Sequence, residues 1–157
     1  GKELGEVHLR GNTVMMGYFR DKVASKKVFK NNWFSTGDLG VIHKNGYMEL
    51  KDRLKDIIIS GGENISSVEI ENVIFKMRDV KDVAVVAKKD DKWGEVPCAF
   101  VALKKNSKLN QVKIIDFCKK NMAKFKIPKK IIFGKINKTS TGKTQKYLLR
   151  KIANQTK

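Results

Sequence analysis

The sequence predicts an α+β fold: a β-rich segment, followed by a small domain whose helices flank a mostly antiparallel sheet. Two observations predict it. Apolar runs of strand length alternate with helical patterns after residue 56, and the composition changes at residues 52–55, where charged residues separate two apolar regions. With 157 residues and 41% hydrophobic side chains, the chain has room for one ordinary domain, or for a small domain plus part of another.

The first region reads as strands with one surface helix. Apolar runs at residues 34–42 and 47–50 flank Lys44-Asn45-Gly46, and Asn-Gly between such runs is a strong hairpin signal. A further strand is expected at residues 5–10 and a short helix at 21–29. The segment begins at Gly1 with no initiator Met, so we expect it to be the remainder of something longer.

The second region alternates strands and helices. Ser66 and Glu69 have the spacing of a capping box, and apolar residues follow with helical periodicity. Asn110 is placed to cap a second helix, and a closing helix is expected over residues 144–153. Strands are expected at 57–59, 80–87, 96–103 and 130–133, and Trp93-Gly94-Glu95 is expected to be a packed turn, not a binding motif.

The charge is concentrated near the C-terminus. Of the net charge of +18, most lies in residues 104–157, which carry 17 Lys and Arg against one acidic residue. Such a block attracts phosphates on a cofactor or on nucleic acid, whereas a solvated lysine-rich surface is the plain alternative. A nucleic-acid-binding module remains a remote alternative, because the four aromatic residues of this region form no recognisable stacking platform.

Several classes of protein are disfavoured. No apolar run approaches the length of about 18 residues that a membrane span needs. Cys98 and Cys118 are isolated, without CxxC or histidines at ligand spacing, so neither a metal site nor a disulfide scaffold is expected. An intracellular, cytoplasmic location fits these cysteines best, and organellar targeting stays open because the true N-terminus is not visible.

Two motifs in the first region suggest nucleotide chemistry. Asp38 follows Thr36-Gly37 at a strand-to-turn position, where an open carboxylate can accept hydrogen bonds from a ribose diol; an ordinary turn is the alternative. Arg53, in the charged break, can clamp a diol or a phosphate with its planar fork, unless the break is only a solvated linker.

Two loops of the second region carry further candidates. Gly61-Gly62 follow an isoleucine run, where two glycines permit close approach of a ligand or simply form a tight turn. Lys143 lies in Lys138-Thr-Ser-Thr-Gly-Lys-Thr, a polar loop ahead of a helix. This loop is not a Walker A motif, because Asn137 stands where that motif needs glycine. A surface loop in a lysine-rich region is the alternative.

Taken in order, these motifs identify the chain. The segments Gly5 to Gly11, Gly17 to Phe19, Trp33 to Asp38, Asp52 to Glu71 and Lys138 to Lys143 recur in one known sequence of motifs. The chain resembles the C-terminal third of adenylate-forming acyl-CoA synthetases, and most closely their short- to medium-chain fatty acid CoA ligases. The resemblance implies that residues 1–52 end the large adenylation domain, 53–55 form a hinge and 56–157 form the small C-terminal domain.

The resemblance also implies roles for single residues. Asp38 and Arg53 match the ribose-binding residues for ATP, and Lys55 matches the hinge residue. Asn64 stands near the adenylate phosphate, where relatives often have Gln. Lys143 matches the lysine that contacts the phosphate and carboxylate oxygens while the adenylate forms.

Gly61 and Gly62 match the loop lining the pantetheine tunnel for CoA. Two departures bear on these roles. Asn137 replaces the proline usual before the lysine loop, and Ile59 replaces a lysine of luciferases and coumarate ligases, which argues against those subfamilies.

The function implied is that of an ATP-dependent, AMP-forming ligase. It joins a fatty acid to CoA through an acyl-adenylate, with Mg²⁺ held mainly by the missing N-terminal domain, and the small domain rotates between the two steps. The alternative within the superfamily is an enzyme that loads a carrier-protein thiol. We expect the chain alone to be inactive.

Overall fold

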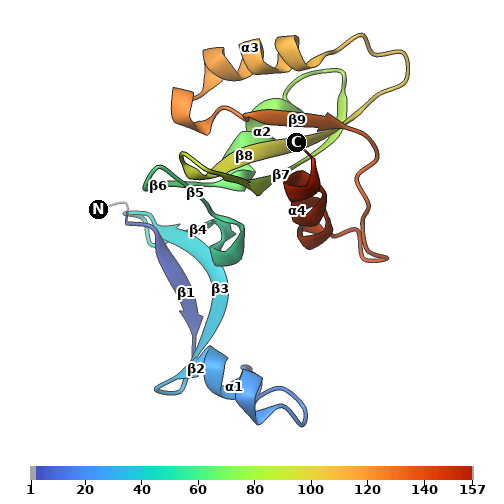
Figure 1. The fold of residues 1–157 in the computed structure, drawn as a ribbon. Coiled ribbons are helices and arrows are strands. Elements are labelled where there is room, and N and C mark those ends of the chain that lie inside the picture. The colour runs from blue at the N-terminus through green and yellow to red at the C-terminus, as the bar shows by residue number, and fades with distance from the viewer. Residues whose placement is uncertain (1–2, 157) are drawn as a thin grey trace. The chain divides into compact units, whose positions relative to one another are not determined.

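The computed structural model describes residues 3–156 and divides into two compact units, one through Lys55 and one from Asp56 onward (Figure 1). A 3-10 turn at Leu54–Asp56 spans the division.

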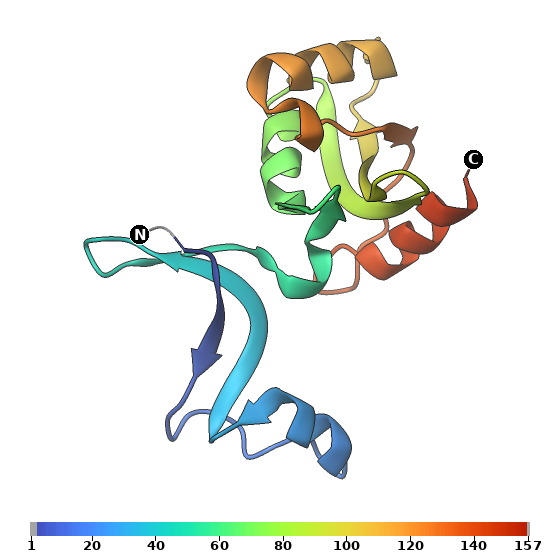
Figure 2. The same ribbon diagram turned by 60° about the vertical axis from the view of Figure 1, so that its left-hand side comes forward.

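The first unit is a four-stranded antiparallel sheet with one helix. Strand β3 (Trp33–Ile42) pairs with β1 (Gly5–Leu9), β2 (Phe29–Lys30) and β4 (Met48–Arg53). Figure 2 shows β3 as a long bent strand with β1 beside it. Helix α1 (Lys22–Val28) begins at Asp21, whose carboxylate accepts a hydrogen bond from the Ala24 amide at 2.8 Å. The predicted hairpin and surface helix are both present.

The first unit buries few apolar side chains of its own. Among its described residues, only Leu39 and Val41 are hydrophobic side chains that reach full burial. Large apolar side chains stay exposed on both the sheet and the loops: Leu4, Leu9, Met15, Met16, Tyr18, Phe19, Val23, Trp33, Ile42, Tyr47, Met48, Leu50 and Leu54.

The second unit is built on a five-stranded sheet. Its order is β6 (Glu63–Ile65), β5 (Ile58–Ser60), β8 (Gly94–Leu103) and β7 (Val80–Asp90), and β9 (Lys130–Phe133) also pairs with β8. All pairs are antiparallel except β8 with β9, which run parallel. The predicted α+β class with a mostly antiparallel sheet is confirmed.

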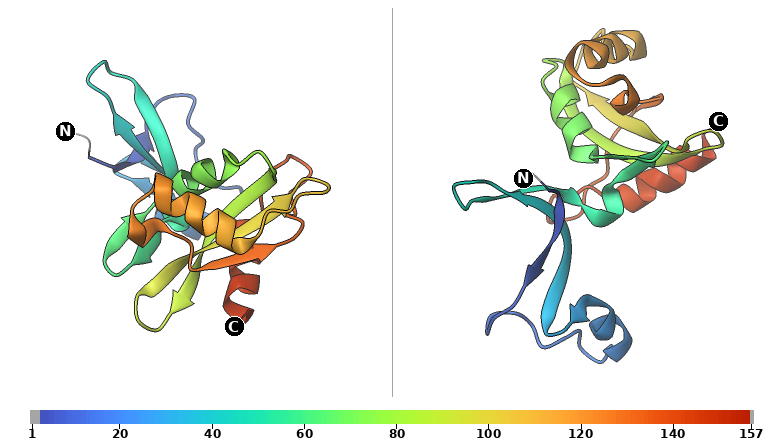
Figure 3. Two further views of the ribbon diagram at one scale, coloured as in Figure 1. Left: turned by 90° about the horizontal axis from the view of Figure 1, so that it is seen from above. Right: turned by 90° about the vertical axis from the view of Figure 1, so that its left-hand side faces the viewer.

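Helices cover both faces of this sheet (Figure 3). On one face, α2 (Ser67–Phe75) and α3 (Gln111–Asn121) enclose a core of aliphatic side chains that includes Ile58, Ile70, Val85 and Ile114. On the other face, α4 (Lys146–Gln155) packs Leu149 and Ala153 against Val86 and Phe100.

Two helices of the second unit begin at the capping residues expected from the sequence. The Ser66 hydroxyl accepts a hydrogen bond from the Glu69 amide at 3.2 Å, and the Asn110 side chain accepts one from the Lys113 amide at 3.0 Å. The expected start of the closing helix at residue 144 is wrong by two residues: Thr144 forms an antiparallel bridge with Lys138, so α4 begins at Lys146.

Both cysteines are unpaired and buried in the second unit. Burial raises the pKa of the Cys98 thiol to about 11, and it raises the pKa of the Cys118 thiol to about 11 as well. Nearby Lys88 and Lys130 lower the pKa of Cys98, but burial outweighs them. The two thiols are inert core side chains at neutral pH.

Candidate functional site

Asp38 and Arg53 lie opposite each other on neighbouring strands. They are partners in the β3–β4 register, next to an irregularity at Leu39, and Arg53 Nε donates a hydrogen bond to Asp38 Oδ1 at 2.9 Å. The side chain of Asp38 is 34% exposed, so its carboxylate remains accessible to a ligand. The geometry places an acceptor carboxylate beside a planar cation, a pair suited to a diol or a phosphate.

Asp38 lies within β3, so the strand-to-turn position expected from the sequence is wrong: the strand continues through Gly37 and Asp38 because it pairs with β4 there. Hydrogen bonds to β1 fix this part of the strand. The Thr36 hydroxyl donates to the Val7 carbonyl at 2.8 Å and accepts from the Asp38 amide at 3.0 Å. Gly37 adopts a φ of +72°, which favours glycine, and its amide donates to Glu6 Oε1 at 3.1 Å. The position of Asp38 is therefore set before any ligand binds.

A hollow of about 390 Å³ lies against this pair. Its lining consists of Thr36, Gly37, Arg53, Leu54 and Lys55, all within the first unit. Arg53 and Lys55 give it positive charge, which complements phosphate. Two of the residues singled out from the sequence, Arg53 and Lys55, thus line one cavity, and Asp38 is ion-paired to one of them.

The two glycines form the turn between β5 and β6, and they differ in surroundings. Gly61 has a φ of +59°, and a Cβ added there would lie 2.8 Å from Cε3 of Trp93. Gly62 has a φ of +87°, and a Cβ there would meet no atom within 4 Å. The Gly61 amide also donates to the Trp93 carbonyl at 2.9 Å. Gly61 is thus required for packing against Trp93, while Gly62 borders open space.

Neighbouring residues fix this turn to β8. Glu95 Oε2 accepts a hydrogen bond from the Ile59 amide at 3.0 Å, and Ser60 is in register with Gly94. Asn64 lies on β6 as the register partner of Ile59, and both side chains are exposed. The packed turn expected at Trp93-Gly94-Glu95 lies slightly earlier: residues 91–93 form the turn, and Gly94 and Glu95 already belong to β8. This turn supports the glycine turn through Trp93.

Lys143 lies on a small loop closed by its own hydrogen bonds. Residues 138–144, called the lysine loop below, are joined at their ends by the Lys138–Thr144 bridge. The Thr139 amide donates to the Lys143 carbonyl at 2.9 Å, and the Lys143 amide donates to Thr139 Oγ1 at 3.1 Å. Gly142, with a φ of +80°, donates to the Thr139 carbonyl at 2.9 Å. Hydrogen bonds within residues 138–144 therefore determine most of the loop's conformation.

The three lysines in and beside this loop differ in their partners. Lys138 Nζ lies 2.6 Å from Asp82 Oδ2, and Lys146 Nζ lies 2.7 Å from both Glu71 Oε1 and Ser67 Oγ. The side chain of Lys143 is exposed and has no ion pair or side-chain hydrogen bond with any residue between 3 and 156. Lys143 alone of the three presents an ammonium group that a ligand can take up.

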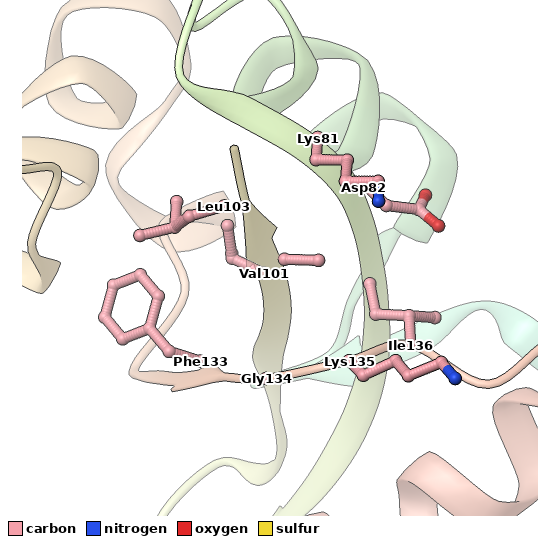
Figure 4. Close-up of a pocket in the computed structure, with 9 residues that line it drawn as sticks. Lys81, Asp82, Val101, Leu103, Phe133, Gly134, Lys135 and Ile136 are labelled. Atoms are coloured by element: carbon pink, nitrogen blue, oxygen red, sulfur yellow. The ribbon is translucent and has the colours of Figure 1, made fainter. Parts of the chain in front are cut away.

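A larger hollow of the second unit, about 470 Å³, lies elsewhere (Figure 4). Val101, Leu103 and Phe133 form an apolar side, and Lys81, Asp82, Lys135 and Ile136 border it. None of the residues predicted for a site lines it, so size alone does not mark the candidate site here.

The predicted residues fall into three groups. Asp38, Arg53 and Lys55 gather in the first unit, whereas the glycine turn with Asn64 and the loop with Lys143 belong to the second. Sequence reasoning missed Asp82, Glu71 and the contact of Trp93 with Gly61. The Trp-Gly-Glu turn was a visible signal for the last, but nothing local in the sequence marks Asp82 or Glu71 as partners of distant lysines.

Some properties concern the described chain as a whole. Between residues 3 and 156, no helix is both long and apolar enough to cross a membrane. In the same range, no group of three or more His, Cys, Asp or Glu side chains is arranged to hold a metal ion.

Known proteins are similar to this chain in sequence and in fold. Residues 69–143 match the family described as AMP-binding enzyme C-terminal domain. A probable peroxisomal acyl-activating enzyme of Arabidopsis thaliana is 51% identical over 98% of the chain, which covers 28% of that protein. A peroxisomal trans-cinnamate:CoA ligase of Petunia hybrida is 53% identical over 98% of the chain and 27% of its own length.

A solved structure agrees with these relatives. The ATP-bound MatB of Rhodopseudomonas palustris superposes with a TM-score of 0.91 at 34% identity, over 96% of this chain and 30% of that one. The chain thus spans less than a third of the length of the proteins it matches.

Proposed function

The chain belongs to the AMP-binding enzyme family and corresponds to its C-terminal part, and from this we propose that the full-length protein is an ATP-dependent, AMP-forming acyl-CoA ligase. The observation that carries the proposal is the lysine loop, in which Lys138 and Lys146 are ion-paired while Lys143 presents an uncommitted charge within the described chain. Lys143 is therefore the lysine of this loop that is available to bind a ligand.

In the first step, a carboxylate oxygen of the acid forms a bond to the α-phosphorus of ATP, and the bond from that phosphorus to the bridging oxygen breaks to release pyrophosphate. Two anions approach each other in this reaction. Lys143 holds its positive charge next to the reacting oxygens and offsets their mutual repulsion in the transition state. Mg²⁺, when bound, neutralises charge on the phosphates, and the described residues offer no metal cluster of their own.

Asp38 and Arg53 orient the nucleotide. The Asp38 carboxylate accepts hydrogen bonds from the ribose hydroxyls, and the Arg53 guanidinium, held at 2.9 Å from Asp38, reaches the same ribose. Asn64, exposed on β6, supplies an amide near the adenylate phosphate. The fixed strand segment around Asp38 supports this role, because a preorganised acceptor loses little entropy on binding.

In the second step, the CoA thiol gives up its proton to solvent and its sulfur forms a bond to the acyl carbon, while the bond from that carbon to the AMP oxygen breaks and AMP leaves. Gly62 lets the pantetheine pass close to the backbone at the β5–β6 turn, and Gly61 keeps that turn packed on Trp93. Lys55 is the hinge about which residues 56–157 rotate between the steps, so that Lys143 leaves once the adenylate has formed. The acid is of the fatty acid class.

A carrier-protein thiol is the alternative acceptor. The Petunia relative is named a CoA ligase, which favours CoA. A parallel assay of the full-length protein with CoA and with a carrier protein distinguishes the two, since only the true acceptor releases AMP in step with thioester formation.

The test of the proposal is Lys143→Ala in the full-length enzyme. Loss of one positioned charge costs about 10²–10³ in the rate of adenylate formation, or roughly 3–4 kcal/mol, measured by pyrophosphate exchange. The second step, started from ready-made acyl-adenylate and CoA, stays near the wild-type rate.

The control for this test is Lys135→Ala, which removes an exposed lysine of the same segment. Lys138 and Lys146 are unsuitable controls because each holds an ion pair. Adenylate formation at the wild-type rate in Lys143→Ala refutes the assignment of Lys143.

A further inference from the structure

We propose that Asp82 is a positioning residue for Lys143, acting through its ion pair with Lys138. This inference rests on the proposed function, because it concerns the placement of the lysine that acts during adenylate formation. Asp82 does not contact the reacting atoms in this proposal; it holds the lysine loop in place on the sheet.

The lysine loop is closed on itself by its own backbone and side-chain hydrogen bonds. The bridge between Lys138 and Thr144, and the hydrogen bonds of Thr139 to the amide and carbonyl of residue 143, tie Lys143 to the loop ends. The two threonine hydroxyls of Thr139 and Thr141 also lie 2.9 Å apart. The position of Lys143 is therefore set by whatever holds the two ends of the loop.

The C-terminal end is held by helix α4. Lys146 reaches Glu71 and Ser67 on α2, and its side chain is only 15% exposed. Glu71 Oε1 also accepts a hydrogen bond from the Val85 amide of β7 at 2.7 Å, which fixes the carboxylate to the central sheet. This end of the loop is thus anchored in the partly buried interior.

The N-terminal end is held by Asp82. Ile136 enters the core on the α4 face, but Asn137 and Lys138 that follow it have exposed side chains. Lys138 Nζ then returns to Asp82 Oδ2 at 2.6 Å, on β7. Without this ion pair, the described contacts leave the N-terminal end of the loop only its backbone connection to the buried Ile136 and the hydrogen bond from the Gln145 amide to the Asn137 carbonyl, so the Lys138 side chain no longer holds it to the sheet.

The Asp82 carboxylate is itself oriented by the backbone. Its other oxygen, Oδ1, accepts a hydrogen bond from the Val83 amide at 3.0 Å, next to an irregularity in the β7–β8 pairing at residues 80–82. The side chain of Asp82 is 26% exposed and that of Lys138 is 42% exposed, so water partly screens the pair, and its role here is to set geometry more than to add stability. Asp82 thus presents a fixed acceptor, and the flexible Lys138 adapts to it.

How much the loss of the Asp82–Lys138 ion pair slows adenylate formation depends on how precisely Lys143 must be positioned. A misplacement of about 1 Å at a reacting group can cost on the order of 10²-fold in rate. A loop that keeps its internal bonds and one anchor retains part of that alignment, so we expect a loss of about 10-fold in the adenylation kcat. The loss is smaller than that in Lys143→Ala, which removes the charge itself.

The experiment uses the full-length enzyme with Asp82→Asn, Lys138→Gln and their combination, beside Lys143→Ala and the control Lys135→Gln. Adenylate formation is measured by pyrophosphate exchange, the second step from ready-made acyl-adenylate, and folding from the melting temperature. We expect each pair variant to lower the adenylation kcat about 10-fold with KM for ATP nearly unchanged, and the combination to lower it no further. The second step and Lys135→Gln stay at the wild-type level.

A charge-reversed enzyme carrying Asp82→Lys with Lys138→Asp provides the rescue. Recovery of most of the adenylation rate, relative to either reversal alone, supports positioning through the ion pair. A wild-type adenylation rate in Asp82→Asn, together with a collapsed rate in Lys143→Ala, overturns this inference and leaves the proposed function standing. Equal loss of both steps with a lowered melting temperature shows a merely structural role and overturns it too. A wild-type rate in Lys143→Ala overturns both proposals.

Discussion

Replacing Gly61 with alanine tests whether the contact between the glycine turn and Trp93 requires glycine at position 61. The new Cβ would lie 2.8 Å from Cε3 and 3.1 Å from Cζ3 of the indole, both atoms of a rigid ring. A left-handed φ of +59° costs a residue with a Cβ about 1–2 kcal/mol, and forcing an extra carbon into a filled space costs typically 1–3 kcal/mol more. We expect a total loss of about 2–5 kcal/mol in the free energy of unfolding.

Gly62→Ala is the matched control for this substitution. Its φ of +87° brings the conformational cost, but no atom lies within 4 Å of the new Cβ. We therefore expect Gly62→Ala to destabilise by only about 1–2 kcal/mol. The difference between the two variants isolates the contact with Trp93.

The assay is denaturant unfolding of the chain, followed by circular dichroism and analysed by linear extrapolation. In a Trp93→Ala background the steric part disappears, so Gly61→Ala should cost the same as Gly62→Ala, with a coupling of about 1–3 kcal/mol between positions 61 and 93. Equal costs for the two alanine variants in the native background would refute the packing explanation, and so would a coupling near zero.

Two further predictions follow from the hinge and the cysteines. In the full-length enzyme, Lys55→Pro restricts φ and blocks the rotation, so pyrophosphate exchange survives while transfer to CoA collapses; equal loss of both steps would show that residue 55 is not the pivot. Burial raises the pKa of Cys98 from 9.0 to about 11, so its contribution to stability is complete below pH 9 and lost as the pH rises toward 11. Alkylation by iodoacetamide at pH 8 therefore requires unfolding, and rapid labelling of the native chain would contradict the burial of both thiols.

The sequence predicted the elements whose signals are local. The Asn45-Gly46 turn, the Ser66 cap and the Asn110 cap each depend on residues within a few positions, and the structure has all three. Strand β6 was missed because Glu63–Ile65 has only one apolar residue facing the core, too short a pattern for periodicity to detect. Helix α4 begins late because Thr144 pairs across the lysine loop, a contact that helical pattern does not reveal.

In the candidate site, too, the sequence predicts features that depend on neighbouring residues and misses those that depend on distant contacts. The glycine pair was visible, but its two members were indistinguishable until Trp93 was placed beside one of them. Likewise, Lys138, Lys143 and Lys146 look alike in a lysine-rich segment. Only the positions of Asp82 and Glu71, brought close by the sheet and α2, separate the paired lysines from the exposed one. Which lysine is paired depends on residues that are distant in the sequence, so no local sequence pattern predicts it.

The Glu71 carboxylate has a consequence for the order in which the second unit assembles. It accepts from Val85 on β7 and from Lys146 on α4, and it belongs to α2. Because Lys146 is the last of these residues to be synthesised, α2 and β7 can meet on the ribosome while α4 is still unmade. Lys146 can therefore reach Glu71 only after α2 and β7 have both been synthesised, and the lysine loop gains this anchor last among the contacts of Glu71.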